Sequence, residues 1–332
     1  MRISYEDLYE GLRRVLLDVG FTQPRAELCA HLFIDATVDG VYTHGVNRFP
    51  RFLEMIRRGV IDIHAEPKLV ASYGAIERWD GRRGPGNLNA DAAMKRAIAI
   101  SREQGMGCVA LGNTNHWMRG GSYGWQAAEA GVIGICWTNT LPNLPPWGAR
   151  EPRLGNNPLV IAVPRSEGHI VLDMAMSQFS IGALESYKAR GAELPVAGGF
   201  DSNGKPTRDA AAILTSGRTL PIGYWKGSGL ALMLDLLATV LSGGKATFQI
   251  PKDSHQETGL SQMFLAFDLG SIDNDQLTEG IVNQIIDFVH GAAAFGDEKV
   301  RYPGERRLEV RKQNLAEGIP VEPEIWERIQ QL

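Results

Sequence analysis

Apolar positions recur with helical spacing through the first sixty residues. Over residues 5–19, leucine and valine side chains fall every three or four positions, with Ser4 before this run and Gly20 after it. Such spacing gathers the apolar side chains on one face, and serine and glycine are typical of the first and last positions of a helix. Two further helical segments, from about Thr22 to Gly40 and from about residue 44 to Gly59, complete a predicted helical unit.

From residue 68 onward, short apolar runs separated by glycine and polar residues replace the helical spacing. Runs of this length are typical of β-strands. The predicted strands are residues 69–73, 76–79, 108–111, 132–137, 159–163, 170–173 and 263–269. Helices are expected between some of them, from Asn89 as N-cap to Gln104 and around residues 125–130. Because two strands follow each other without a helix between them, the sequence predicts an α/β fold with a mixed sheet.

Three later segments add to this pattern. Glycine, proline and asparagine are dense between Thr138 and Pro158, which predicts a long ordered loop, and such loops are usually functional. The run from Gly227 to Leu241 is apolar nearly all round, which predicts a helix buried against the sheet. Helices are also expected over residues 273–290 and in two short pieces at the end, the last from about Pro323 to Leu332.

The length of the chain changes the expected organisation. At 332 residues it exceeds the usual size of a single hydrophobic core, so two subdomains are expected. The first is a helical subdomain of residues 1–65, which we expect to pack with the C-terminal helices of residues 273–332. The second is an α/β subdomain of residues 66–272. No clean linker or internal repeat separates them, so one interlocked body is the simplest arrangement.

Composition excludes several classes of protein. The net charge is −4 and the pI about 6.0, with lysine and arginine scattered, so nothing indicates binding to nucleic acid or to an anionic membrane. The sequence contains neither a signal-like segment nor an apolar run long enough to span a bilayer, so we expect a cytoplasmic protein. Cys29, Cys108 and Cys136 lie far apart in apolar contexts, which predicts reduced core residues. No metal site is indicated.

The segment from Tyr42 to Phe52 carries a proton-transfer group and a fixed cation four residues apart, His44 and Arg48. If the chain turns helical at His44, both side chains share a face, and Pro50 falls in the first turns. Histidine can donate a proton near neutral pH, and arginine can hold a carboxylate through two hydrogen bonds. Taken alone, this pair is more typical of a surface helix than of a site.

Three further segments have the composition of a site, although the common phosphate-binding motifs GxGxxG and GxxxxGK[ST] are absent. Residues 113–123 join His116 to a glycine-rich loop. Residues 169–177 form a predicted strand in which Asp173 could accept hydrogen bonds from ribose hydroxyls. Residues 221–229 combine glycines, Lys226 and a helix start, which together suit a pyrophosphate. Considered alone, residues 113–123 are equally compatible with an ordinary loop. The composition of residues 169–177 by itself favours an ordinary strand, and residues 221–229 are also compatible with a plain helix start.

Together these segments resemble the type-2 malate/L-lactate dehydrogenase family, NAD(P)-dependent oxidoreductases that do not use the Rossmann fold. The matching motifs are YTHGVNR at residues 42–48, NH at 115–116, NP at 157–158, LDMA at 172–175, KG at 226–227 and PGE at 303–305. They occur in family order over effectively the whole chain. Residues 183–198 depart from the family pattern.

The resemblance implies roles for individual residues. It implies His44 as the proton donor, and Thr43, Arg48 and His116 as substrate-binding residues. It implies the cofactor-binding residues His169, Ile170, Val171, Leu172, Asp173, Met174, Ala175, Trp225, Lys226, Gly304, Glu305 and Arg306. It also implies a homodimer whose site lies in a cleft partly closed by the partner subunit.

The expected activity is the transfer of hydride from NADH to the C2 keto carbon of a 2,3-dioxo sugar acid, with NADPH as a possible cofactor instead. An alternative within the family is the reduction of another 2-oxo acid or of a cyclic imino acid. An alternative of a different class is a sugar-acid binding protein without catalytic activity. The pair of histidines argues against this last alternative.

Overall fold

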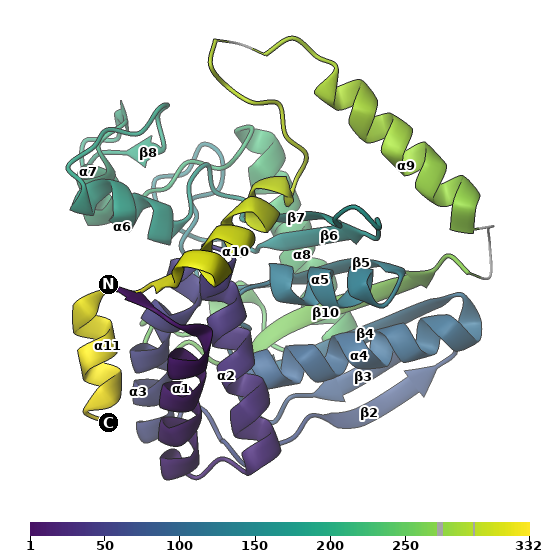
Figure 1. Cartoon of the computed structure of the whole chain (residues 1–332). Coiled ribbons are helices and arrows are strands. Elements are labelled where there is room, and N and C mark those ends of the chain that lie inside the picture. Colours follow the sequence, from purple (N-terminus) through teal and green to yellow (C-terminus); the bar gives the residue numbers. More distant parts are fainter. Residues whose placement is uncertain (271–274, 295) are drawn as a thin grey trace.

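A seven-stranded mixed sheet lies at the centre of the computed structural model, which describes residues 1–270, 275–294 and 296–332 (Figure 1). The strand order is β2-β3-β4-β10-β5-β6-β7. The strands are β2 (Lys68–Tyr73), β3 (Ile76–Asp80), β4 (Met106–Thr114), β5 (Val132–Thr138), β6 (Leu159–Val163), β7 (Ile170–Met174) and β10 (Leu260–Asp268). Only β3 and β4 pair in parallel, and the other neighbours are antiparallel. The predicted strands and the mixed sheet are confirmed.

Strand β10 separates β4 from β5, although it follows them by more than a hundred positions in the chain. It pairs antiparallel with both neighbours and is buried over most of its length. Its apolar side chains alternate between the two faces of the sheet, as the period of a strand requires. Phe264 packs in the cluster on one face, and Met263 packs in the cluster on the other.

Helices cover both faces of this sheet. Helices α4 (Gly86–Gln104) and α5 (Gly121–Glu129) pack on one face, and α8 (Trp225–Ser242) packs on the other. The prediction that α8 is buried is only half right. Its alanines at 231 and 238 contact the sheet, but seven apolar side chains on its other side are 37–68% exposed in the single chain. An all-round apolar helix can therefore carry a second, uncovered face.

The helical unit at the start of the chain includes the end of the chain (Figure 1). Its apolar cluster joins the first helices to Trp326 and Ile329. The elements are β1 (Arg2–Ile3), α1 (Tyr5–Val19), α2 (Gln23–Val38), α3 (Phe49–Arg57), β11 (Ile319–Pro320) and α11 (Pro323–Gln330). The short strands β1 and β11 pair with each other. The predicted subdomain boundary at residues 272–273 lies outside the described residues.

The segment between β7 and α8 forms a small unit that the sequence pattern did not predict. Its elements are α6 (Ile181–Ala189), β8 (Gly199–Phe200), β9 (Pro206–Thr207) and α7 (Ala210–Ser216). It has its own apolar cluster around Leu184, Leu194 and Ile213. Two backbone hydrogen bonds, Gln178 to Leu220 and Ile222 to Met176, close its base. Such a short cluster carries too little periodicity to be recognised from the sequence.

The remaining elements are α9 (Asp275–His290), α10 (Glu305–Glu317) and the 3-10 turn η3 (Thr247–Gln249). Residues 273 and 274 of the helix predicted over 273–290 lie outside the described residues. Helix α4 starts after Pro85 and not at Asn89. The Asn89 side chain instead donates to the Gly81 carbonyl and the Thr114 hydroxyl. None of the described helices has the length and apolar character needed to cross a bilayer.

Candidate active site

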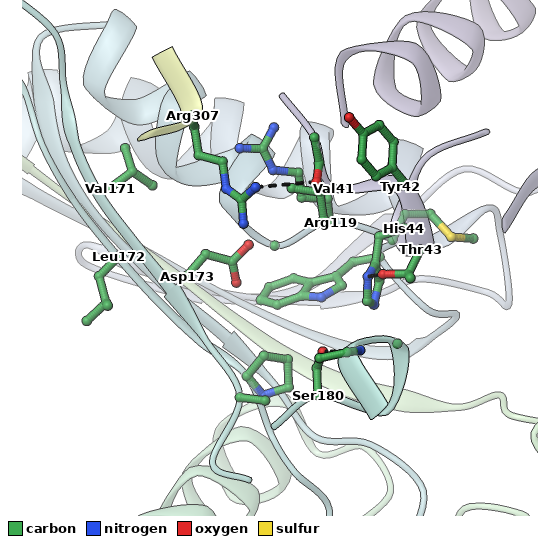
Figure 2. A pocket seen from close by; sticks show the side chains of 18 of the residues that line it. Val41, Tyr42, Thr43, His44, Arg119, Val171, Leu172, Asp173, Ser180 and Arg307 are labelled. Atoms are coloured by element: carbon green, nitrogen blue, oxygen red, sulfur yellow. Dashed lines mark hydrogen bonds between the residues drawn. The ribbon is translucent and has the colours of Figure 1, made fainter. Parts of the chain in front are cut away.

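A cavity of about 560 Å³ lies where the helical unit, the sheet, α6 and α10 meet (Figure 2). It receives residues from seven separate segments of the chain. Eight of the predicted site residues line it, namely Thr43, His44, His116, Val171, Leu172, Asp173, Ala175 and Gly304. The structure thus brings the predicted proton donor into one cavity with part of the predicted cofactor-binding strand.

His44 lies at the end of a short 3-10 turn, η1 (Tyr42–His44). A second 3-10 turn, η2 (Val46–Arg48), follows after Gly45, whose backbone is not helical (φ −99°, ψ −137°) and which has no room for a side chain beside Thr37. The Thr37 hydroxyl accepts the Val46 N–H at 2.8 Å and so fixes this break. The prediction that His44 and Arg48 share one helical face is therefore wrong, because α3 starts only at Phe49. Pro50 does fall in its first turn.

The rings of His44 and His116 stack in the cavity, with centroids 5.7 Å apart and planes 19° apart. The Met118 N–H donates to His116 Nδ1 at 3.0 Å, so the neutral ring carries its hydrogen on Nε2. The Thr43 hydroxyl lies 3.1 Å from His44 Nδ1. This contact leaves His44 Nε2 free to exchange a proton with a ligand.

Burial and nearby cations favour the neutral form of both histidines. Burial, then Arg48 and Arg119, lower the pKa of His44 to about 4. Burial and then Arg48 hold the pKa of His116 well below its usual range. A positive potential of this kind attracts anionic ligands, and a bound anion would in turn favour a protonated His44.

Arg48 does not line the cavity, although its charge acts on both histidines. Burial lowers the pKa of its guanidinium, and the carboxylates of Glu257 and Glu185 partly offset this. Among the residues that the structure describes, no hydrogen bond or ion pair of Arg48 is found. Its guanidinium thus keeps hydrogen-bond donors without a protein partner in the described part of the chain, beside the two histidines.

Strand β7 and the start of α10 form the opposite wall of the cavity. The Val171 N–H donates to the Pro303 carbonyl at 2.9 Å, so the segment before α10 covers the free edge of β7. Gly304 has a φ of 101°, and a Cβ there would come within 3.1 Å of the Val171 nitrogen. Asp173 projects into the cavity, where its carboxylate accepts the Gly121 N–H at 2.8 Å. Burial raises the pKa of Asp173 from its ordinary value.

The other predicted cofactor residues lie outside this cavity. Glu305 accepts the Tyr302 N–H and faces His290 at 3.2 Å. His169 lines a second cavity of about 450 Å³, which shares Arg119, Trp125 and Arg307 with the first. The remaining predicted residues, which line neither cavity, are Ile170, Met174, Trp225, Lys226 and Arg306. Trp225 and Lys226 are exposed at the start of α8. The β-bridge between Ser177 and Pro221 brings the segment before α8 next to the residues that follow β7.

Sequence reasoning gave no role to two cations of the cavity, Arg119 and Arg307. Arg119 stands three residues after His116, in the same predicted site segment. Its position in the sequence could therefore have indicated that it belongs to the site. Arg307 lies about one helical turn after Gly304, which brings its side chain to the same side of α10. Helix α6 also contributes Gly182, where a Cβ would meet the Thr43 side chain at 2.6 Å.

Comparison with known proteins decides the family. The sequence pattern of the malate/L-lactate dehydrogenase family matches residues 3–330. The chain belongs to this family. The family expected from the motifs, its fold and its oxidoreductase class are therefore confirmed.

Full-length relatives of this family member carry a narrower name. The chain is 46% identical to the 2,3-diketo-L-gulonate reductase of Citrobacter koseri over 334 residues, which cover all of both chains. It is 45% identical to that of Escherichia coli O6:K15:H31, again over all of both chains.

Solved structures share the fold. The malate dehydrogenase of Entamoeba histolytica matches with a TM-score of 0.94 at 26% identity, covering all of this chain and 96% of that one. The delta1-piperideine-2-carboxylate reductase of Pseudomonas syringae matches with a TM-score of 0.87 at 30% identity, covering all of this chain and 99% of that one. The family implies a nicotinamide cofactor.

Proposed function

We propose that the protein reduces 2,3-diketo-L-gulonate to 3-dehydro-L-gulonate with NADH. Two observations support this substrate and reaction. The relatives at 45–46% identity bear this activity in their names and align over their whole length. The observation that carries the chemistry is that His44 lies in one cavity with Asp173 and Gly304.

The residues of the cavity suit a nicotinamide cofactor. Gly304 lets the start of α10 pack directly on the edge of β7, where any side chain would crowd the Val171 nitrogen. The backbone N–H groups at the start of α10 favour phosphate oxygens, and the carboxylate of Asp173 suits a hydroxyl or amide donor. We propose that residues 169–175, Trp225, Lys226 and residues 304–306 hold this cofactor. When bound, the nicotinamide supplies the hydride.

In the proposed mechanism, His44 Nε2 donates a proton to the keto oxygen of the substrate as that oxygen gains negative charge. General acid help of this kind accelerates a reaction by roughly a hundredfold to ten-thousandfold. His116, stacked on His44 and holding a hydrogen on Nε2, orients the dicarbonyl as a donor. Thr43 holds the Nδ1 side of the His44 ring. The guanidinium of Arg48 binds the substrate carboxylate.

A panel of substrates tests this function. The purified protein is assayed for NADH and NADPH oxidation with 2,3-diketo-L-gulonate, pyruvate, oxaloacetate and a cyclic imino acid. We expect the highest kcat/KM with diketogulonate and NADH. A higher value with the cyclic imine and NADPH would favour the second candidate, which the 30% identity to the piperideine-carboxylate reductase supports. Calorimetric binding of the sugar acid without any oxidation of cofactor would point to a binding protein.

We also propose that the protein forms a homodimer through α8. Seven apolar side chains form the exposed side of this helix, which is too large an apolar surface to stay in water. They are Leu230, Leu232, Met233, Leu236, Leu237, Val240 and Leu241. The same face continues toward the exposed Trp225, so a partner seated on it would lie beside the proposed cofactor residues at the start of α8.

The cytoplasm is the proposed compartment. The three cysteines are free and buried, as expected for a reducing environment. We propose further that residues 1–65 with the C-terminal helices form one subdomain, and that residues 66–272 form the other, with the cavity between them. No metal takes part in the proposed mechanism.

A further inference from the structure

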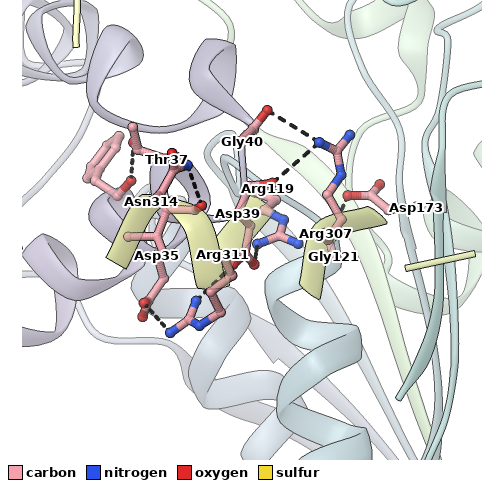
Figure 3. A network of polar contacts seen from close by, with 12 residues as sticks. Asp35, Thr37, Asp39, Gly40, Arg119, Gly121, Asp173, Arg307, Arg311 and Asn314 are labelled. Carbon is pink, nitrogen blue, oxygen red and sulfur yellow. Dashed lines mark hydrogen bonds and ion pairs between the residues drawn. The ribbon is translucent and has the colours of Figure 1, made fainter. Parts of the chain in front are cut away.

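Two arginines from distant segments meet the carboxylate of Asp39, just before the turn that carries His44 (Figure 3). Arg119, from the loop between β4 and α5, donates to one oxygen. Arg311, from α10, donates to the other at 2.8 Å and also binds Asp35. Asp39 and Arg119 are each only 5% exposed. A buried carboxylate held from two sides fixes the backbone from which it projects.

A third arginine, Arg307 of α10, holds the backbone at Asp39 and Gly40. Arg307 lies with one guanidinium nitrogen 3.3 Å from the carbonyls of both Asp39 and Gly40. The Asn314 amide donates to the Val38 carbonyl just before Asp39. The Thr37 hydroxyl accepts the Val46 N–H just after the turn that carries His44. The segment that leads to His44 is thus tied to α10, which also begins at the proposed cofactor residues.

Arg119 lies between the two functional ends of the cavity. Burial and Arg48 are the larger causes of the lowered pKa of His44, and the charge of Arg119 adds to them. Burial raises the pKa of Asp173, and the charge of Arg119 partly offsets this rise. Its Nε is buried without a hydrogen-bond partner among the described residues, close to Gly121, whose N–H binds Asp173. A guanidinium held in this place by Asp39 therefore lies between the proton donor and the proposed cofactor wall.

We propose that Arg119, held by Asp39, is a positioning residue of the reaction: it fixes the His44 segment against β7 and sets the charge that His44 experiences. This inference rests on His44 as the proton donor of the proposed function. Neither Arg119 nor Asp39 needs to touch the substrate for this role. Asp39 and Arg119 work as a pair, because the carboxylate offsets the positive charge of the guanidinium.

The charged groups around His44 determine how each substitution changes the pKa of its ring. Arg48 follows it in η2, His116 stacks on it from the loop after β4, and Arg119 faces it from the same loop. From α6, Gly182 and Ala183 line the cavity and carry no charge. Removing Asp39 leaves Arg119 uncompensated and should lower the pKa of His44 further. Removing the charge of Arg119 should raise it.

The test uses Asp39→Asn, Arg119→Met and the double variant. The readout is the titration of the His44 ring in the ligand-free protein by NMR, assigned with His44→Gln. We expect the single variants to shift the His44 midpoint in opposite directions by roughly half a unit or more. The double variant should return it toward the wild-type value. Both single variants should lose at least about tenfold in kcat, with the Kd for NADH changed less than threefold.

Glu77→Gln is the matched control, because Glu77 is also a buried carboxylate in an arginine pair, with Arg96, and does not line the cavity. It should leave the His44 midpoint and kcat unchanged. Breaking a buried ion pair can unfold a protein, so two conservative variants, Arg119→Lys and Asp39→Glu, are also tested. They keep both charges and should therefore keep the wild-type midpoint of His44.

Shifts in the same direction, or no shift in folded variants, would overturn the inference and leave the pair a purely structural one. The failure of the proposed function is separate, because it would appear as full activity in His44→Gln or as no reduction of diketogulonate by the wild-type protein.

Discussion

His44 must be neutral in the empty cavity and must still deliver a proton during reduction. Burial and two cations hold its pKa near 4, so at neutral pH the ligand-free ring is largely unprotonated. A substrate carboxylate would add a negative charge near these cations and so favour the protonated ring. The proton donor would thus be charged mainly when an anionic ligand is bound.

Replacing His44 with alanine is expected to lower kcat by roughly a hundredfold to ten-thousandfold, the usual contribution of general acid catalysis. The Kd for NADH, measured by fluorescence titration, should change little, because the proposed cofactor wall is formed by β7 and α10. Equal loss of cofactor binding and turnover would identify His44 as a structural residue instead.

The pKa of His44 also predicts a pH dependence of stability. Because the pKa falls from 6.5 to about 4 on folding, the unfolded chain binds this proton first as the pH is lowered. The free energy of unfolding should therefore decrease between pH 6.5 and 4, by at most about 3 kcal/mol and less where water reaches the ring. Urea unfolding of wild type and His44→Gln across this range measures the difference. An identical slope in both proteins would contradict the prediction.

Arg48→Lys is expected to raise the KM for the sugar acid about tenfold or more, since losing a charge-assisted hydrogen bond costs roughly 1.5–3 kcal/mol. An ammonium keeps the charge but cannot form two parallel hydrogen bonds with a carboxylate. Steady-state kinetics at saturating NADH measures this. An unchanged KM would remove Arg48 from carboxylate binding.

At the scale of residues, the sequence identified the reactive side chains that stand in recognisable motifs. His44, His116 and Asp173 stand in motifs, and all three line the cavity. Arg307 was not found, because an arginine on a charged helix such as α10 gives no signal of the cavity beside it. Arg119 stands in the same segment as His116, but its pairing with Asp39 joins positions eighty residues apart and depends on tertiary structure.

At the scale of elements, the edge of β7 depends on one glycine. Gly304 has a left-handed backbone and packs directly on Val171. A side chain there meets backbone strain and crowds the backbone of β7, and it would push the start of α10 away from the proposed cofactor wall.

Gly304→Ala should lower stability by about 1–2 kcal/mol through backbone strain and should also weaken NADH binding. Gly59→Ala is the matched control, because Gly59 has a positive φ of 71° and nothing within 4 Å of an added Cβ. The control should lose stability alone. Calorimetric titration with NADH compares the two, and equal affinities would separate Gly304 from cofactor binding.

Elements with strong periodicity were predicted well, and their irregular joints were not. The strands of the sheet follow from short apolar runs. The break at Gly45 depends on the Thr37 hydroxyl, which lies in another helix. The start of α4 was misplaced because Asn89 is a typical N-cap residue, whereas here its side chain binds Gly81 and Thr114. Tertiary contacts decide such positions, and the sequence does not display them.

At the scale of the whole molecule, α8 links packing to assembly. Introducing Leu236→Glu and Val240→Glu into its exposed face should convert the proposed dimer into a monomer without unfolding the subunit. Light scattering after size-exclusion chromatography measures the mass. Val70→Glu is the matched control, because Val70 is 60% exposed on β2, and Val240 is 68% exposed. A dimer that persists in the double variant would place the interface elsewhere.

The α/β class of the whole molecule follows from the alternation of strands and helices, but the strand order does not. Nothing in the sequence of β10 indicates that it inserts between β4 and β5. Its apolar side chains suit any central strand, so the pattern predicts that β10 is buried but not which strands pair with it. Similarly, the joining of the first and last helices into one cluster requires the folded chain.

The position of β10 has a consequence for biosynthesis. A ribosome releases β4 and β5 long before β10, so both strands wait with unpaired edges while the intervening segments emerge. Open strand edges readily recruit other chains, which makes this interval the most hazardous one for aggregation. Chaperones that shield nascent chains should therefore matter until Asp268 has left the exit tunnel, and only then can the central sheet close.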